Sequence, residues 1–315
     1  MRVYTIQNYN YSKLSKKQKD PIAFKSMLYD PDSFIHRKSP ALNLLDNYFK
    51  HTISVSRVAW HIPDKELEPY IKVIDIENEK QPHIRMWDIN TGKKTKYAIV
   101  LHGLNNNITS LQELYKGIFT STDYAVLAPE YHGFTPNDKK DVCLNPKTIL
   151  RDVDNAIKYL NADGIPNENI TLIGHSFGCY SASELAKKYP DLEDLILICP
   201  VNTKVYFSQK IKESKFKSVP ASVKNTITGS VWTKSILDSF FNPNKVLRKV
   251  KAPVDIVFAS SDKYSNSAAT NKTANSCKNL RSINTVDSEH KMSSDKIAKV
   301  ISILNSNQRL DEQLF

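Results

Sequence analysis

No apolar run in this sequence of 315 residues approaches the roughly 18 residues that a membrane-spanning helix needs. The first residues also lack the apolar stretch of a signal peptide. We therefore expect a protein that is not exported through a signal peptide and that works in the cytoplasm. Export by a signal-independent route would leave no mark in the sequence.

Cysteine is scarce, and the four cysteines match no spacing of metal ligands; they are Cys143, Cys179, Cys199 and Cys277. We expect free thiols in a reducing compartment. The sequence therefore gives no reason to expect a metal or a cofactor.

Acidic residues are nearly absent from one stretch, 201–251, which holds 11 Lys or Arg but only Glu213 and Asp238. That difference of 11 − 2 = +9 supplies most of the formal net charge of +11. The simpler interpretation is a solvated surface. The alternative is attraction of an anionic substrate or surface, such as phospholipid headgroups, coenzyme A or an acidic acyl carrier protein. No nucleic-acid-binding motif accompanies the charge, so nucleic acid is not an expected partner.

The chain is organised around Ser176, in the sequence Gly-His-Ser-Phe-Gly at 174–178. A short apolar run at 170–173 precedes it, and apolar residues recur at helical spacing over 180–186. The pattern predicts a strand, a tight turn and a helix, with the serine at the turn. Two glycines suit such a turn because the backbones approach too closely for a Cβ atom.

Strand and helix patterns alternate along the rest of the chain, which predicts a mostly parallel sheet with helices on both faces. The first two strands are expected to be antiparallel. Strands are predicted at 70–76, 83–89, 97–101, 124–129, 170–173, 195–200, 252–259 and 280–286, and helices at 111–118, 147–161, 180–186, 268–278 and 297–304.

The serine turn, with the loop His-Gly-Leu after the strand at 97–101, resembles the nucleophile elbow and oxyanion loop of the α/β-hydrolases. The resemblance implies an eight-stranded sheet interrupted by a cap. We therefore divide the chain into an N-terminal extension that packs on the core (1–65), a first part of the core (66–200), a basic helical cap (201–251) and a second part of the core (252–315).

The order Ser176, Asp262, His290 is that of the α/β-hydrolase triad, and the last two are 290 − 262 = 28 residues apart, enough for one helix and one strand. The resemblance implies that Ser176 is the nucleophile, His290 the base and Asp262 the acid that orients it. It also implies that the backbone N–H groups of Leu104 and Phe177 form the oxyanion hole.

Other candidates for these roles are weaker. Asp287 and Glu289 are close to His290 in sequence, but neighbours on one loop are poorly placed to reach its Nδ1. We expect His102 to be buried and to shape the oxyanion loop. The sequence at 130–135 is similar to the Asp-x-Arg-Gly-x-Gly loop of many α/β-hydrolases, but Glu130 replaces the aspartate.

A serine nucleophile excludes the relatives that attack with aspartate, namely haloalkane dehalogenases and epoxide hydrolases. Esterase, lipase, thioesterase, acyltransferase and peptidase remain. Aromatic residues in the cap favour an acyl chain, and its lysines favour a charged remainder, so we predict hydrolysis of a lipid-like carboxylic ester or thioester. The alternatives are an acyltransferase with the same triad, or an inert hydrolase fold that binds a partner through its basic cap.

Overall fold

The computed structural model describes residues 2–6, 61–78, 81–103, 106–131, 146–201, 205 and 242–313. Most of the predicted N-terminal extension and of the predicted cap therefore lie outside the described residues, as does Leu104. In the part of the chain that is described, no helix is long and apolar enough to cross a bilayer.

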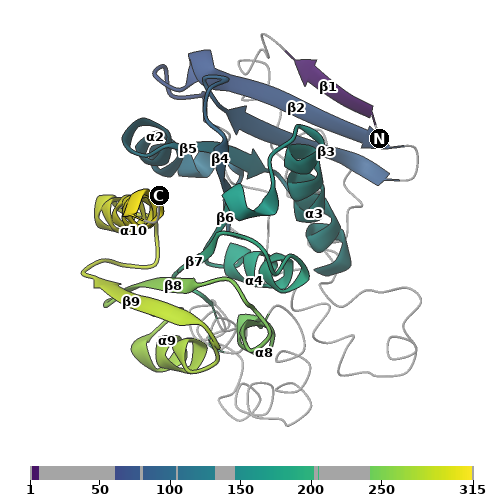
Figure 1. Ribbon diagram of the computed structural model, residues 1–315. Helices are drawn as coiled ribbons and strands as arrows, with labels where there is room; N and C mark the ends of the chain where they lie inside the picture. The colour runs from purple at the N-terminus through teal and green to yellow at the C-terminus, as the bar shows by residue number, and fades with distance from the viewer. Residues whose placement is uncertain are drawn as a thin grey trace, which may run out of the picture.

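One sheet of nine strands runs through the described structure, in the order β1-β2-β3-β5-β4-β6-β7-β8-β9 (Figure 1). The strands are β1 (Arg2–Ile6), β2 (Ile71–Asn78), β3 (Gln81–Ile89), β4 (Lys96–Leu101), β5 (Tyr124–Pro129), β6 (Ile170–His175), β7 (Asp194–Ile198), β8 (Val254–Ala259) and β9 (Leu280–Val286). From β5 to β9 all neighbours are parallel, whereas β1, β2 and β3 pair antiparallel. The prediction of a mostly parallel sheet is confirmed.

The strand β1 was not predicted from the sequence. It adds a ninth strand at the antiparallel edge, where Arg2 lies opposite Glu77 and Ile6 opposite Val73. Part of the N-terminal stretch thus belongs to the sheet itself.

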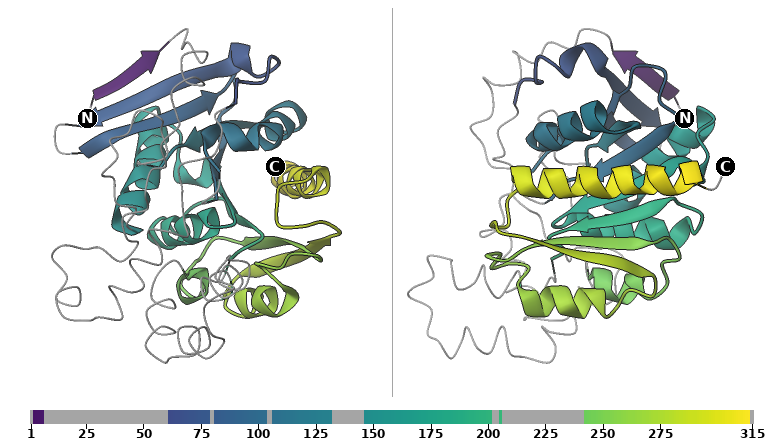
Figure 2. Two further views of the ribbon diagram at one scale, coloured as in Figure 1. Left: turned by 180° about the vertical axis from the view of Figure 1, so that it is seen from behind. Right: turned by 60° about the vertical axis from the view of Figure 1, so that its left-hand side comes forward.

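Helices cover both faces of the sheet, as predicted. On one face lie α2 (Gln112–Ser121) and α10 (Ser294–Gln313), and on the other lie α3 (Pro146–Ala162), α4 (Gly178–Lys188) and α8 (Pro243–Leu247) (Figures 1 and 2). α9 (Ser267–Ala274) packs on α8. Three short 3₁₀ helices, Glu68–Tyr70, Ile108–Leu111 and Asn167–Asn169, occur in the connections.

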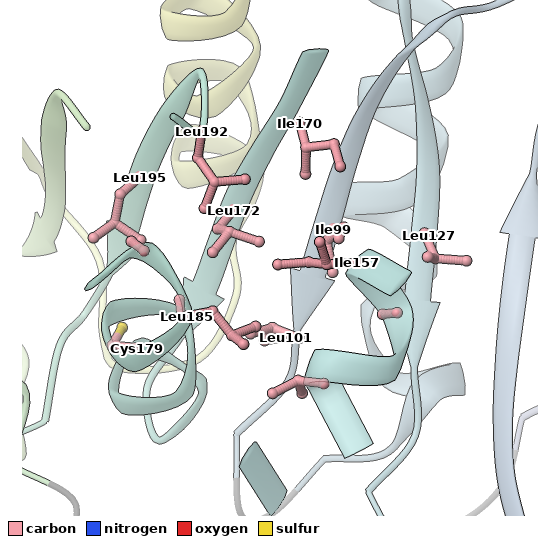
Figure 3. Packing of buried hydrophobic residues seen from close by; sticks show 14 of the residues in the cluster. Ile99, Leu101, Leu127, Ile157, Ile170, Leu172, Cys179, Leu185, Leu192 and Leu195 are labelled. Atoms are coloured by element: carbon pink, nitrogen blue, oxygen red, sulfur yellow. The ribbon is translucent and has the colours of Figure 1, made fainter. Parts of the chain in front are cut away.

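The core forms two layers because successive side chains of a strand point to opposite faces. In β4, Ile99 and Leu101 contribute to the layer beneath α3 and α4, whereas Ala98 and Val100 contribute to the layer beneath α2 and α10. Figure 3 shows the first layer around α4. Burial of strands on both faces explains why their sequences read as continuous apolar runs.

Candidate active site

The turn between β6 and α4 holds Ser176 in a left-handed conformation, with φ of 55°. A Cβ atom on Gly174 would lie 2.7 Å from the Cα of Cys179, and one on Gly178 would lie 2.2 Å from the carbonyl oxygen of Leu101. Real Cβ atoms do not approach that closely, so both positions require glycine. The strained turn expected of a nucleophile elbow is therefore present.

Three side chains from distant parts of the chain form one hydrogen-bonded line. Ser176 Oγ lies 2.8 Å from His290 Nε2, and His290 Nδ1 lies 2.6 Å from Asp262 Oδ2. Ser176 follows β6, Asp262 follows β8 and His290 follows β9, so all three lie at the carboxyl ends of parallel strands. The structure thus brings together the three residues that the sequence nominated.

The Asp262 carboxylate is held by hydrogen bonds on both oxygens. Its Oδ1 accepts the backbone N–H groups of Tyr264 at 2.8 Å and Ser265 at 2.9 Å, and its Oδ2 faces His290. Burial opposes its ionisation, but these hydrogen bonds outweigh burial and lower the pKa of Asp262 below its usual value. The group facing the imidazole is therefore a carboxylate at neutral pH.

The two other acids considered from the sequence do not face the imidazole. Asp287 is exposed, and its Oδ1 accepts the hydroxyl of Ser260 at 2.8 Å. Glu289 is exposed as well. The preference for Asp262 over these neighbours agrees with the geometry.

The loop after β4 passes directly beside the nucleophile. A Cβ atom on Gly103 would lie 3.1 Å from Ser176 Cβ and 3.5 Å from its Oγ. Phe177, the second predicted oxyanion donor, is the N-cap residue of α4. The N-terminal end of this helix therefore lies next to Ser176, where its dipole favours negative charge.

Comparison with known proteins identifies similar folds. Residues 92–230 match the model of a family described as serine aminopeptidase, S33. The structure is similar to the esterase Pf2001 of Pyrococcus furiosus, with 17% identity, a TM-score of 0.62 and coverage of 79% of this chain and 97% of that one. It is also similar to a putative lipase from Acinetobacter baumannii (14% identity, TM-score 0.55, 76% and 93% covered) and to the thioesterase domain from the curacin biosynthetic pathway (14%, 0.53, 74% and 99%). No curated protein sequence matches the chain.

The chain has the fold of the α/β-hydrolases. The identities are too low to transfer a substrate from any of these proteins. For that reason the chemistry of this protein has to be argued from its own residues.

Two buried groups beside the loop after β4 form a pair that the sequence did not reveal. His102 is buried, as predicted, and its Nε2 lies 2.6 Å from Oε1 of Glu130. Oε2 of the same carboxylate accepts the backbone N–H of Ile108 at 2.8 Å. Glu130 thus explains the departure from the usual loop sequence, because it links the end of β5 to both ends of the loop after β4.

The cysteines that the structure describes are free, namely Cys179, Cys199 and Cys277. Cys179 is fully buried and donates its thiol to the carbonyl of Gly174 at 3.1 Å. Cys199 is also buried, and it adopts the left-handed conformation directly after β7, with φ of 49°.

A candidate group of metal ligands overlaps the triad. Ligand atoms of Cys199, Asp262 and His290 lie within 4.8 Å of one another. However, burial raises the pKa of Cys199 to about 12, so a thiolate ligand is unfavourable there. The other two groups already bond to each other at 2.6 Å. The residues fit a triad better than they fit a metal.

Proposed function

We propose that this protein is a serine hydrolase that cleaves carboxylic esters or thioesters through an acyl-enzyme on Ser176. The observation that carries the proposal is the hydrogen-bonded line from Ser176 through His290 to Asp262 on a strained elbow. A turn that costs stability and a histidine between a serine and a carboxylate have no evident purpose in a protein that only binds.

In the first half of the reaction, Ser176 Oγ bonds to the carbonyl carbon while His290 Nε2 takes its proton. The π electrons of the carbonyl move to its oxygen, where the N–H groups of Leu104 and Phe177 are the proposed donors. Collapse of this intermediate breaks the bond to the leaving group, which takes the proton from His290. Asp262 fixes the imidazole with Nδ1 protonated and stabilises its cation.

In the second half, water attacks the acyl-enzyme and gives a proton to His290 Nε2. The acid leaves as Ser176 recovers its proton. If an alcohol or amine replaces water in this step, the same residues perform acyl transfer. The family model that matches residues 92–230 is described as a serine aminopeptidase, so amide substrates belong in the same test.

For the substrate we propose a lipid-like acyl group joined to an anionic remainder. Support comes from the sequence of the predicted cap, in which aromatic residues accompany the lysines. Attraction between charged groups weakens with salt, whereas binding of the acyl chain does not. Raising the salt concentration should therefore increase KM for an anionic substrate and leave KM for a neutral ester of the same chain length unchanged.

The decisive experiment is reaction with a fluorophosphonate, followed by intact mass, for the wild type, Ser176→Ala and Ser261→Ala. Ser261 is an exposed serine near the triad and serves as the matched control. We expect one adduct on the wild type and on Ser261→Ala, and none on Ser176→Ala. Turnover of acyl esters, thioesters and aminoacyl anilides then defines the reaction, with alcohols and amines added to detect transfer.

Ester turnover that survives Ser176→Ala would overturn the proposal. No adduct on any of the three proteins would favour the inert fold that binds a partner through its basic cap.

A further inference from the structure

The loop that carries His290 is held through three of its consecutive backbone carbonyls. The carbonyl of His290 accepts a hydrogen bond from Nε2 of His175 at 3.2 Å. The carbonyl of Lys291 accepts one from Nζ of Lys296 at 2.6 Å, and the carbonyl of Glu289 accepts a second from the same Nζ. The side chain of His175, at the elbow, therefore holds the backbone of His290. The side chain of Lys296, in α10, holds the backbone of the residues directly before and after it.

The burial of Lys296 is unusual for its residue type. Its side chain is 0% exposed, although lysine is almost never fully buried without a partner of opposite charge. Within the described part of the chain, no carboxylate forms an ion pair with it. Removing an amino group from water costs free energy unless hydrogen bonds replace those to water. The carbonyls that accept these hydrogen bonds are the two that flank His290. Burial of the Lys296 amino group is therefore compensated only when this loop keeps its geometry.

His175 is suited to the same task because it stays neutral. Its burial, together with repulsion from Lys296 and from His290 when that imidazole is protonated, lowers its pKa from 6.5 to about 3. Its Nδ1 has no hydrogen-bond partner in the described structure, and its Nε2 faces a carbonyl, so the proton lies on Nε2. The ring of His175 also lies against that of His290, with centroids 5.7 Å apart.

We propose that Lys296 and His175 are positioning residues that set the place of the His290 imidazole between Ser176 and Asp262. The inference rests on the proposed function, because it concerns how the same triad is held. Proton transfer from Ser176 depends on the 2.8 Å contact with His290, and the orientation of the imidazole depends on the 2.6 Å contact with Asp262. A loop displaced by a fraction of an ångström weakens both contacts. Neither residue touches the substrate in this role.

The first test compares Lys296→Met with Val300→Ala. Methionine keeps much of the apolar stem of lysine but cannot donate to the carbonyls. Val300 is a fully buried residue of the same helix and packs in the core layer beneath α2 and α10, so its truncation destabilises the helix packing by another route. We expect fluorophosphonate labelling of Ser176 to slow roughly 10- to 100-fold in Lys296→Met, in line with the effect of a small misplacement. Val300→Ala should label at the wild-type rate below its own unfolding temperature.

A second readout does not depend on activity. The proton on His290 Nδ1, in its short hydrogen bond to Asp262, should give a far-downfield NMR signal that is assigned by its loss in His290→Gln. We expect Lys296→Met to shift or broaden this signal and Val300→Ala to preserve it. An unchanged signal together with an unchanged labelling rate in Lys296→Met would overturn the inference.

The two readouts also separate this inference from the proposed function. A wild type that never labels, with a signal that still moves in Lys296→Met, would refute the hydrolase but keep the positioning role. If Lys296→Met does not fold, His175→Gln and His175→Leu decide the question. Glutamine can still donate to the His290 carbonyl and leucine cannot, so leucine should be the slower of the two, and equal rates would contradict the proposal.

Discussion

The imidazole of His102 and the carboxylate of Glu130 lie 2.6 Å apart, almost fully screened from solvent, where the neighbouring strands β4 and β5 end. Both ring nitrogens of His102 face acceptors, because Nδ1 lies 2.9 Å from the carbonyl oxygen of Gly103. Both oxygens of Glu130 accept backbone N–H groups, from Ile108 and Tyr131. A buried, hydrogen-bonded pair of side chains therefore anchors the loop that lies beside the nucleophile.

Glu130→Gln should destabilise the protein by about 1–3 kcal/mol, because the amide replaces one buried acceptor by a donor. That donor faces either His102 or a backbone N–H, so a buried hydrogen bond is lost. Urea unfolding at pH 7 measures the change. Glu113→Gln, an exposed glutamate on α2, is the control and should change the free energy of unfolding by less than about 0.5 kcal/mol. Equal effects of the two substitutions would contradict the anchoring role of Glu130.

Asp262→Asn should preserve the fold but reduce kcat by about 10⁴-fold. The amide oxygen can still accept the N–H groups of Tyr264 and Ser265, so its nitrogen is left facing His290 Nδ1. Nδ1 must then accept, the proton moves to Nε2, and Nε2 can no longer take the proton of Ser176. Steady-state ester hydrolysis measures the loss. Asp287→Asn is the matched control, and an equal loss there would favour the acid next to His290 in sequence.

The main architecture was predictable because it depends on local periodicity. Continuous apolar runs identified the buried strands, and glycines around Ser176 identified the elbow. The fold is confirmed, and the structure joins Ser176, Asp262 and His290 as their order suggested. Their catalytic roles stay predictions, as does the oxyanion role of Leu104, which lies outside the described residues.

Other parts of the site were not predictable, because they depend on contacts between distant segments. Lys296 looks like an ordinary solvated lysine in a helix until the carbonyls of its loop are known to surround its amino group. Glu130 looks like a departure from a motif until His102 is found against it. The strand β1 is separated from its partner β2 by more than 60 residues, and no turn signal links them.

Acidification should destabilise the protein through His175. Because its pKa is about 3 in the folded state and 6.5 when unperturbed, the unfolded chain binds a proton between these values that the folded chain does not. The free energy of unfolding should therefore fall as pH decreases from 6.5, with His175 contributing up to about 1.4 kcal/mol per pH unit. Urea unfolding at several pH values should show a smaller slope for His175→Gln. The control is His61→Gln, at an exposed histidine, which should leave the slope of the free energy of unfolding against pH nearly unchanged. A wild-type slope in His175→Gln would refute the assignment of this pH dependence to His175.

Two glycine substitutions separate steric exclusion from backbone conformation. Gly164 has φ of 86° and nothing within 4 Å of an added Cβ, so Gly164→Ala should cost only about 1–2 kcal/mol for the left-handed conformation. At Gly178 an added Cβ would meet the carbonyl oxygen of Leu101 at 2.2 Å, and that atom belongs to the central strand β4. Neither backbone can move without separating α4 from the sheet.

Gly178→Ala should therefore cost more than about 4 kcal/mol or prevent folding, and the folded fraction should not label with fluorophosphonate. Thermal unfolding measures the loss of stability, and fluorophosphonate labelling measures the loss of reactivity. A Gly178→Ala protein as stable and reactive as Gly164→Ala would show that the elbow tolerates a wider separation between α4 and β4 than its geometry implies.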